Sequence, residues 1–231
     1  MHRFKQKCMK YRKCKFKARK MKKENSRSAV IIAKGRFPRH PIPLSYINKA
    51  EYIVCCDGAA NEFIAGGGIP NAIVGDGDSV SAENRQRFGS ILHINRDQET
   101  NDLTKSVHYC VQQGITDIVI VGGTGRREDH TLGNISLLAE YIAIDEINHV
   151  IMTTDWGIFT PIRVDQVFQS FKGEAVSLFS IDREPITTHN LEYALDNRVL
   201  TNWWQGSLNV SLGDTFTVKT SGRIIVFQAY K

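Results

Sequence analysis

AIVGDGDS, residues 72–79, is an apolar run that breaks into glycines and two aspartates, Asp76 and Asp78. A short β-branched run of this kind predicts a buried strand that stops at a turn. In a parallel α/β sheet, ligands bind at that end of the strands. Two carboxylates at such a place favour a bound cation, and Mg²⁺ held against a phosphate is the commonest arrangement. For this motif alone, a hydrophilic turn that closes a strand is the simpler interpretation.

Acidic side chains recur where other predicted strands meet helices. The other junctions are Asp57 after the apolar run 51–56, Asp129 and His130 after the run 117–121, and Asp102 at the start of a predicted helix over 103–112. Parallel strands end at one edge of a sheet, so we expect these carboxylates to gather there. An acidic edge is costly unless cations neutralise it. Carboxylates without a histidine cluster suit Mg²⁺ better than zinc or iron, so the pattern favours a Mg²⁺ site over isolated turns.

The periodicity of the chain predicts two domains. Strands and helices alternate from residue 29 to about 158, which predicts a Rossmann-like α/β domain with a parallel sheet. From about residue 160 the apolar segments are short, alternate with period two and are separated by turn residues, which predicts strands and hairpins. We therefore expect an α/β domain over 29–158 and a small all-β sandwich domain over 162–231.

Composition excludes several protein classes. The chain has 231 residues, of which 42% are apolar, as is usual for a soluble globular protein. No apolar run is long enough to cross a bilayer, so no membrane association is expected. Five cysteines without a Cys-x-x-Cys spacing argue against a disulfide framework and a structural zinc site. These features predict a cytoplasmic protein.

The net charge of +6 comes from the N-terminal segment. Residues 1–28 contain thirteen Lys and Arg against one Glu, whereas the rest contains seventeen against twenty-three Asp and Glu. This basic segment lacks apolar periodicity, so we predict that it is a disordered tail. It could bind RNA or an anionic surface. We favour the alternative that translation begins at Met21 and that the upstream residues are not part of the protein. Nucleic acid is not expected as a partner, because residues 29–231 are acidic.

A glycine-rich segment follows the predicted strand at 117–121. Gly122, Gly123 and Gly125 would let backbone amides approach a phosphate before a helix, although the P-loop Gly-Lys-Ser/Thr sequence is missing. Arg126 and Arg127 either clamp a polyphosphate or form a solvated loop. Lys105, one helical turn after Asp102, is placed to neutralise phosphate charge, and His130 is either a structural residue or a nucleotide contact.

Four segments resemble, in order and spacing, the signatures of the thiamine pyrophosphokinase family. They are CDGAAN (56–61), VGDGDS (74–79), DQETNDLTK (97–105) and GRREDHTLGN (125–134). The resemblance extends over nearly all of residues 30–231. It implies an enzyme that transfers a pyrophosphoryl group from ATP to the hydroxyl of thiamine, giving thiamine diphosphate and AMP. It also implies Mg²⁺ dependence and a homodimer, with each active site between the α/β domain and the β-sandwich domain of the partner subunit.

Carried over by position, the resemblance implies roles for individual residues. The implied metal ligands are Asp76, Asp78 and Asp102, and the implied catalytic residues are Asp102, Asp78 and Asp57. The implied nucleotide contacts are Gly123, Arg126, Asp129, His130, Asn134 and Lys105. The implied substrate contacts are Gln98, Thr100, Tyr193 and Asn209. The family has a tryptophan against the thiamine pyrimidine where Tyr193 stands; Tyr193, Trp203 or Trp204 is expected to stack there, and core packing is the alternative for Tyr193.

Two other enzymatic functions stay open on sequence grounds. One is a pyrophosphokinase for a different alcohol, such as a pterin, on the same scaffold. Gly77, Ala59 and Leu208 depart from the family pattern, and the last two departures bear on details of substrate contact rather than on the reaction class. The other is a Mg²⁺-dependent phosphoesterase, because Asp-x-Asp and Asp-His pairs also occur in that class.

Overall fold

The computed structural model describes residues 26–231. Most of the basic segment predicted over residues 1–28 lies outside the described residues, and so does the alternative start at Met21. Within residues 26–231, no helix is long and apolar enough to cross a membrane.

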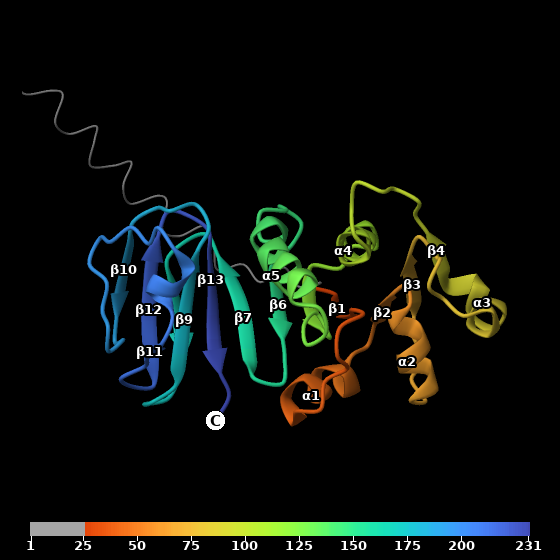
Figure 1. The fold of residues 1–231 in the computed structure, drawn as a ribbon, viewed down its shortest axis with the longest axis horizontal. Coiled ribbons are helices and arrows are strands. Elements are labelled where there is room, and N and C mark those ends of the chain that lie inside the picture. Colours follow the sequence, from red (N-terminus) through yellow and green to blue (C-terminus); the bar gives the residue numbers. More distant parts are fainter. Residues whose placement is uncertain (1–25) are drawn as a thin grey trace, which may run out of the picture.

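Six parallel strands form one half of the molecule (Figure 1). They are β1 (Ser28–Ile32), β2 (Ile53–Cys56), β3 (Ala72–Gly75), β4 (Leu92–Ile94), β5 (Asp117–Val121) and β6 (His149–Thr153). Their spatial order is β4-β3-β2-β1-β5-β6. Every residue of β2 and β3 is buried, which explains why these strands read as continuous apolar runs rather than alternating ones. The prediction of a largely parallel α/β sheet is confirmed.

Five helices connect these strands. They are α1 (Pro41–Lys49), α2 (Ala59–Ala65), α3 (Ala82–Phe88), α4 (Asp102–Gln112) and α5 (Glu128–Tyr141). The side chain of Asn101 accepts a 2.8 Å hydrogen bond from the backbone N–H of Thr104, which caps α4 and fixes Asp102 in its first turn. A short 3₁₀ helix, η1 (Gly89–Ile91), leads into β4.

The second half of the chain is β-rich, as predicted. Its strands are β7 (Gly157–Ile162), β8 (Gln166–Gln169), β9 (Ala175–Ser180), β10 (Ile186–His189), β11 (Asn209–Val210), β12 (Thr215–Thr220) and β13 (Ile224–Ala229), with a 3₁₀ helix, η2 (Trp203–Gly206). Strands β10, β12 and β8 form a separate antiparallel sheet. A second buried apolar cluster, which includes Phe168, Leu178 and Phe216, draws side chains from both sheets of this half.

One sheet runs through both halves. Strand β7 pairs antiparallel with β6 and with β13, so the order continues as β6-β7-β13-β9-β11 and the sheet has ten strands. A tight turn makes this continuation, because the backbone N–H of Thr154 donates to the carbonyl of Gly157 at 3.0 Å. The domain boundary predicted at 158–162 falls within β7 and stays a prediction.

Arg223 contacts Asp182 within the β-rich half and Glu140 in the other half. Its guanidinium donates to the carboxylate of Asp182, with nitrogen–oxygen distances of 2.7–3.1 Å, and to Oε1 of Glu140 on α5 at 2.7 Å. These hydrogen bonds from Arg223 hold the pKa of Asp182 below its usual range. The Glu140 side chain is the more exposed of the two partners, so its ion pair is worth less.

We expect Asp182→Asn to lower the free energy of unfolding by about 1 kcal/mol at pH 7, because it weakens a forked ion pair. The folded-state pKa of Asp182 lies below the unfolded value of about 3.9, so the stabilisation is complete above about pH 5 and is lost as the pH falls further. Urea unfolding from pH 7 down to pH 3 measures this difference. Glu140→Gln is the control and should cost less than about 0.5 kcal/mol. A wild-type advantage over Asp182→Asn that stayed constant down to pH 3 would contradict the assignment.

Candidate active site

A cavity opens where the strand order reverses direction. The chain proceeds from β1 to β2 on one side, whereas β5 lies on the other side of β1, so the crevice falls at their carboxyl ends. A cavity of about 410 Å³ occupies this place. Its lining comes from the ends of β1, β2 and β5, the first turn of α4 and the first half of α5.

Glycines allow the backbone segments that follow β1 and β5 to approach each other closely. The backbone N–H of Gly35 donates to the carbonyl of Gly122 at 2.6 Å, and a Cβ on Gly35 would lie 2.2 Å from that oxygen. Gly122 has a φ of +65°, a left-handed conformation that glycine adopts without strain. The glycine-rich segment after β5 therefore forms one wall of the cavity.

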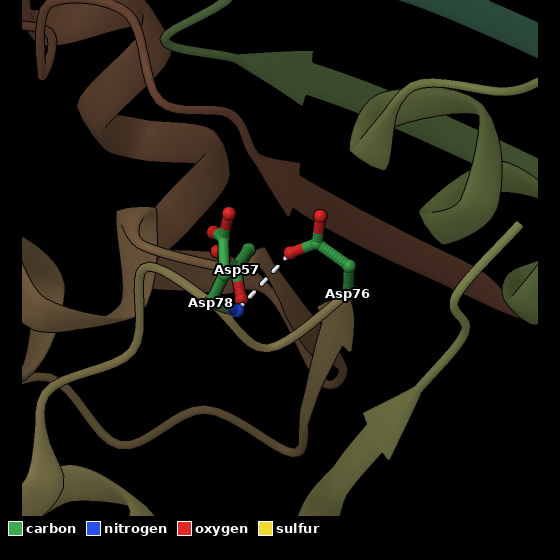
Figure 2. Close-up of side chains that lie close together, drawn as sticks. All are labelled: Asp57, Asp76 and Asp78. Atoms are coloured by element: carbon green, nitrogen blue, oxygen red, sulfur yellow. Dashed lines mark hydrogen bonds between the residues drawn. The ribbon is translucent and has the colours of Figure 1, made fainter. Parts of the chain in front are cut away.

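Three carboxylates meet beside this cavity. Asp57 follows β2, whereas Asp76 and Asp78 follow β3, and each residue offers an oxygen that lies within 4.8 Å of the other two (Figure 2). The backbone N–H of Asp78 donates to Oδ1 of Asp76 at 3.1 Å. We call Asp57, Asp76 and Asp78 the acidic triad. The expectation that acidic side chains distant in sequence converge at one sheet edge agrees with this arrangement.

Asp57 differs from the other members of the acidic triad in its burial and its backbone conformation. It is 1% exposed, with a φ of +32°. Its Oδ2 accepts a 2.9 Å hydrogen bond from the backbone N–H of Ser79, but its buried Oδ1 has no hydrogen-bond partner among residues 26–231. A buried carboxylate oxygen without a donor costs free energy unless a cation satisfies it. This orphaned oxygen and its two carboxylate neighbours fit a divalent cation with oxygen ligands.

Hydrogen bonds keep Asp78 charged. The Ser79 hydroxyl donates to Asp78 Oδ1 at 2.8 Å, and this bond lowers the pKa of Asp78. Gly77, between the two aspartates, has a φ of +81°, which supports the turn that aims both carboxylates at Asp57. The turn therefore presents Asp78 to the acidic triad as an ionised oxygen ligand.

Asp102 lies beside the acidic triad in the first turn of α4. Burial raises its pKa, and the charge of Asp57 raises it further, while Lys105 opposes both effects. Gly75 makes this closeness possible, because a Cβ there would lie 2.6 Å from the Asp57 Cβ and 3.1 Å from Asp102 Oδ1. The sequence grouped Asp102 with Asp76 and Asp78, whereas the three-carboxylate cluster in the structure contains Asp57.

Most of the residues predicted to contact a nucleotide line the cavity. Gly123, Arg126, His130 and Asn134 do so, and Asn134 Nδ2 donates to the Gly123 carbonyl at 2.8 Å. Arg126 also pairs with Glu62 on α2 at 2.7 Å.

The other two predicted nucleotide contacts lie elsewhere. Asp129 is not in the cavity lining; hydrogen bonds from Arg127 lower its pKa to about 2. Lys105 is buried on α4 with its Nζ 3.5 Å from Asp102 Oδ1, and it lines a second cavity of about 460 Å³ beside β4.

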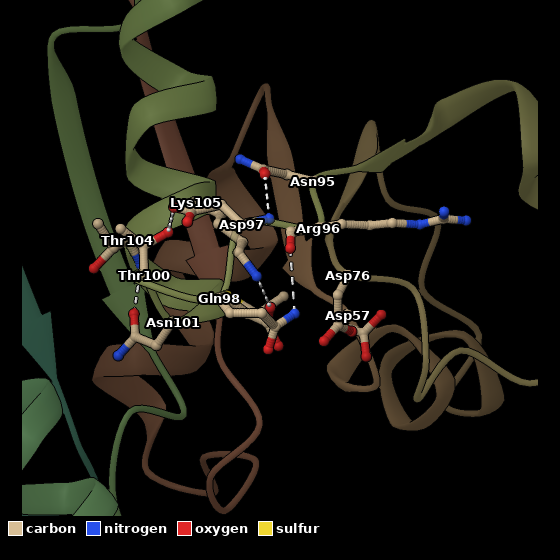
Figure 3. Close-up of polar contacts among 12 residues, drawn as sticks. Asp57, Asp76, Asn95, Arg96, Asp97, Gln98, Thr100, Asn101, Thr104 and Lys105 are labelled. Carbon is tan, nitrogen blue, oxygen red and sulfur yellow. Dashed lines mark hydrogen bonds and ion pairs between the residues drawn. The ribbon is translucent and has the colours of Figure 1, made fainter.

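Gln98 and Thr100 lie on the loop between β4 and α4 (Figure 3). The backbone N–H of Asn95 donates to the Gly75 carbonyl at 2.7 Å, which places the start of this loop next to Asp76. Thr100 Oγ1 donates to Asp97 Oδ2 at 2.7 Å, and Gln98 Nε2 donates to the Arg96 carbonyl at 3.3 Å. These internal bonds shape the loop alongside the acidic triad.

Tyr193 and Asn209 lie at the far end of the molecule. Asn209 is buried on β11, and its side-chain amide bonds both the N–H and the carbonyl of Tyr193, at 3.0 and 2.9 Å. Tyr193 itself is 63% exposed. Strands β11 and β3 are eight positions apart in the ten-stranded sheet, which at about 4.8 Å per position is roughly 38 Å. Within one chain, these residues cannot contact a substrate that is bound at the acidic triad.

The aromatic candidates differ in their surroundings. Trp203 packs edge-on against Phe179, with ring centroids 5.7 Å apart, whereas Trp204 is largely exposed. Leu208 is exposed with a φ of +60°, a strained conformation for leucine. Tyr193, Trp204 and Leu208 are thus exposed side chains of the β-rich half.

Sequence reasoning missed Lys34 and Ser79 as site residues. Lys34 follows β1 and lines the cavity, and its Nζ donates to Ser79 Oγ at 2.7 Å. The strand-end rule that identified the aspartates applies equally to β1 and would have identified Lys34. Ser79 was part of the quoted motif, but its role emerges only from its contacts with Asp57 and Asp78.

Comparisons with known proteins agree with this architecture. The family described as "Thiamin pyrophosphokinase, catalytic domain" matches residues 44–151, and "Thiamin pyrophosphokinase, substrate-binding domain" matches residues 157–227. Thiamine pyrophosphokinase 1 of Oryza sativa subsp. japonica is 28% identical over 200 residues, which cover 73% of this chain and 74% of the relative. Thiamine pyrophosphokinase of Bacillus subtilis (strain 168) is 28% identical over 182 residues, covering 72% and 81%.

A further relative and a solved structure give the same picture. Thiamin pyrophosphokinase 1 of Caenorhabditis elegans is 35% identical over 104 residues, a match that spans 41% of this chain and 42% of the relative. The structure of thiamin pyrophosphokinase from Candida albicans superimposes with a TM-score of 0.74 at 21% identity, over 88% of this chain and 90% of that one, and shows that the fold is shared. The chain therefore belongs to the thiamin pyrophosphokinase family and is a thiamine diphosphokinase, a transferase of thiamine diphosphate biosynthesis.

Proposed function

We propose that the acidic triad and the adjoining cavity are where this chain transfers pyrophosphate from ATP to thiamine. The observation that carries the proposal is Oδ1 of Asp57, which is buried among carboxylates and has no hydrogen-bond partner within residues 26–231; the neighbouring Cys56 lines the cavity. A buried acid with no donor is costly, and proteins retain such groups where they bind cations or do chemistry.

Asp57, Asp76 and Asp78 would hold a divalent cation, with Asp102 adjoining them. Hard oxygen ligands favour Mg²⁺, whose charge when bound stabilises the negative phosphate oxygens of the transition state. Asp57 thereby joins Asp76 and Asp78 as a ligand, in addition to its implied catalytic role.

The transfer requires a group that accepts the hydroxyl proton of thiamine and residues that orient thiamine. The thiamine hydroxyl oxygen forms a bond to the β-phosphorus of ATP, the bond from that phosphorus to the oxygen bridging to the α-phosphorus breaks, and AMP leaves with that oxygen. The hydroxyl proton passes to the carboxylate of Asp102, which lines the cavity from the first turn of α4. Gln98 and Thr100, on the loop beside Asp76, would position thiamine.

The cavity is proposed as the ATP subsite. Its lining offers the backbone of Gly123 and the side chains of Arg126, His130 and Asn134. Arg126 contributes positive charge against the phosphates and Asn134 fixes the glycine-rich wall. Lys105 is proposed to moderate the charge of Asp102 rather than to reach the nucleotide directly.

The thiamine subsite is proposed to include a second copy of the chain. The separation of roughly 38 Å between β11 and the acidic triad leaves a single chain without the predicted aromatic contact. In a homodimer, the partner's Tyr193, oriented by the partner's Asn209, would face thiamine. Thiamine is a cation, so a triad of carboxylates and an aromatic face attract it together.

Three free thiols are buried in the part of the chain that the structure describes, and they support a reducing compartment. Cys55, Cys56 and Cys110 are unpaired and buried, and burial raises the pKa of each thiol, so they are unreactive core residues. We propose that the protein works in the cytoplasm.

A single assay separates this function from its alternatives. We expect AMP to form from ATP and Mg²⁺ only when thiamine is present, with one thiamine diphosphate per AMP. A pterin alcohol offered in place of thiamine should give no AMP. Acceptor-independent release of phosphate would instead indicate a phosphoesterase, and AMP formation with the pterin alone would indicate a different acceptor.

A further inference from the structure

Lys34 connects the cavity to the acidic triad. It lies at the carboxyl end of β1 and lines the cavity, while its Nζ donates to Ser79 Oγ at 2.7 Å. Ser79 in turn donates its backbone N–H to Asp57 and its hydroxyl to Asp78. The ammonium group is therefore linked to the Asp78 carboxylate through two hydrogen bonds, and Lys34 also lines the cavity that is proposed for the nucleotide.

The fold leaves room for this side chain. A Cβ on Gly58 would lie 2.8 Å from Lys34 Nζ and 2.9 Å from its Cε, so glycine at that position lets the lysine stem lie against the start of α2. Any larger residue there would displace the ammonium group from Ser79.

Lys34 differs from the other cations that line the cavity. Arg126 pairs with Glu62, and Arg127 pairs with Asp129. Among the ion pairs within residues 26–231, none includes Lys34. An ammonium group has three N–H donors, and the contact with Ser79 uses one of them.

We propose that Lys34 is a further catalytic residue, which contacts the β- and γ-phosphates of ATP at the junction between the cavity and the acidic triad. This inference rests on the proposed function. The transferred pyrophosphoryl group must lie between the triad carboxylates and the rest of the nucleotide, where several negative charges meet. A cation with free donors at that junction offsets their repulsion and stabilises the charge that develops on the phosphate oxygens.

The competing interpretation is that Lys34 only orients Ser79 and the triad. Binding of two nucleotides separates the interpretations, because AMP lacks the β- and γ-phosphates. The probe is the ATP analogue with a methylene group between the α- and β-phosphorus, which cannot release AMP. Calorimetry is done with the full chain, in Mg²⁺ and in EDTA.

We expect Lys34→Met to weaken the analogue about tenfold, in EDTA as well as in Mg²⁺, and to leave AMP affinity unchanged. Turnover with thiamine should fall at least about tenfold, and Lys34→Arg should recover part of both losses. Lys49→Met, an exposed lysine in the last turn of α1, is the matched control and should behave as the wild type. Lys34→Gln replaces Lys34→Met if that variant does not fold.

Two results would overturn the inference. One is a Lys34→Met variant that binds the analogue as tightly as the wild type does. The other is an equal loss of affinity for AMP and the analogue, which would indicate a purely structural role. A wild-type chain that makes no AMP with thiamine would instead refute the proposed function, so the two failures are distinguishable.

Discussion

Asp57→Asn should lower turnover by about 10²–10³-fold while leaving the protein folded. Asparagine has nearly the same shape as aspartate and tolerates the φ of +32° at this position. Its oxygen can still accept from the Ser79 backbone N–H, so the local turn is preserved. What the substitution removes is one negative oxygen ligand from the acidic triad.

The same substitution should not destabilise the metal-free protein. Asp57 Oδ1 is buried without a donor from the described part of the chain and lies near two other carboxylates, an arrangement that costs free energy when no cation is present. In EDTA, the Tm of Asp57→Asn should therefore equal or exceed that of the wild type. Added Mg²⁺ should raise the Tm of the wild type and have little effect on the variant, because only a bound ion stabilises the folded state.

Asp145→Asn is the matched control for this experiment. Asp145 is 93% exposed in its side chain and lies on the loop after α5, away from the triad. This variant should keep wild-type turnover and the wild-type response to Mg²⁺. An Asp57→Asn protein with near-normal turnover, or one that lost activity only by unfolding, would refute the assignment of Asp57.

Two defective variants should restore each other's activity when their subunits are exchanged. Asp57→Asn damages the α/β half, and Tyr193→Ala removes an exposed aromatic face worth about 1–3 kcal/mol of stacking, or about tenfold to hundredfold at low thiamine. If each active site takes its triad from one chain and Tyr193 from the other, a mixed dimer has one intact site. Random re-pairing makes half of the dimers mixed, so about a quarter of wild-type activity should return.

The control for complementation combines two variants of the same half. Asp57→Asn mixed with Asp76→Asn places both defects in the acidic triad. Every mixed dimer then has two damaged triads, so a shared site predicts no recovery of activity. Sedimentation measures whether the chains pair at all. A mixture of Asp57→Asn and Tyr193→Ala that showed no more than the sum of its separate activities would contradict the shared site.

The sequence contained enough to predict where the acidic residues would meet. Apolar runs that end in aspartate mark buried parallel strands, and β2 and β3 are such strands, fully buried and adjacent. Period-two segments after residue 160 likewise predicted the β-rich half. These features depend on local patterns, which a single sequence records directly.

The geometry between elements was not predictable in the same way. Asp57 rather than Asp102 completes the three-carboxylate cluster because Gly75 and the turn at Gly77 set distances between separate strand ends. Lys105 faces the second cavity because of its position around α4, which sequence spacing from Asp102 did not reveal. The continuous sheet depends on the pairing of Met152 with Phe159, a register that is fixed by a tight turn rather than by hydrophobic pattern.

The most direct test is to locate the ion. Crystals of the full chain grown with Mn²⁺ in place of Mg²⁺ and with the α,β-methylene analogue of ATP would show the metal by its anomalous scattering. We predict a peak between the carboxylates of Asp57, Asp76 and Asp78, with analogue phosphates in the cavity beside it. An ordered ion bound elsewhere, or analogue phosphates seated away from these carboxylates, would contradict the account.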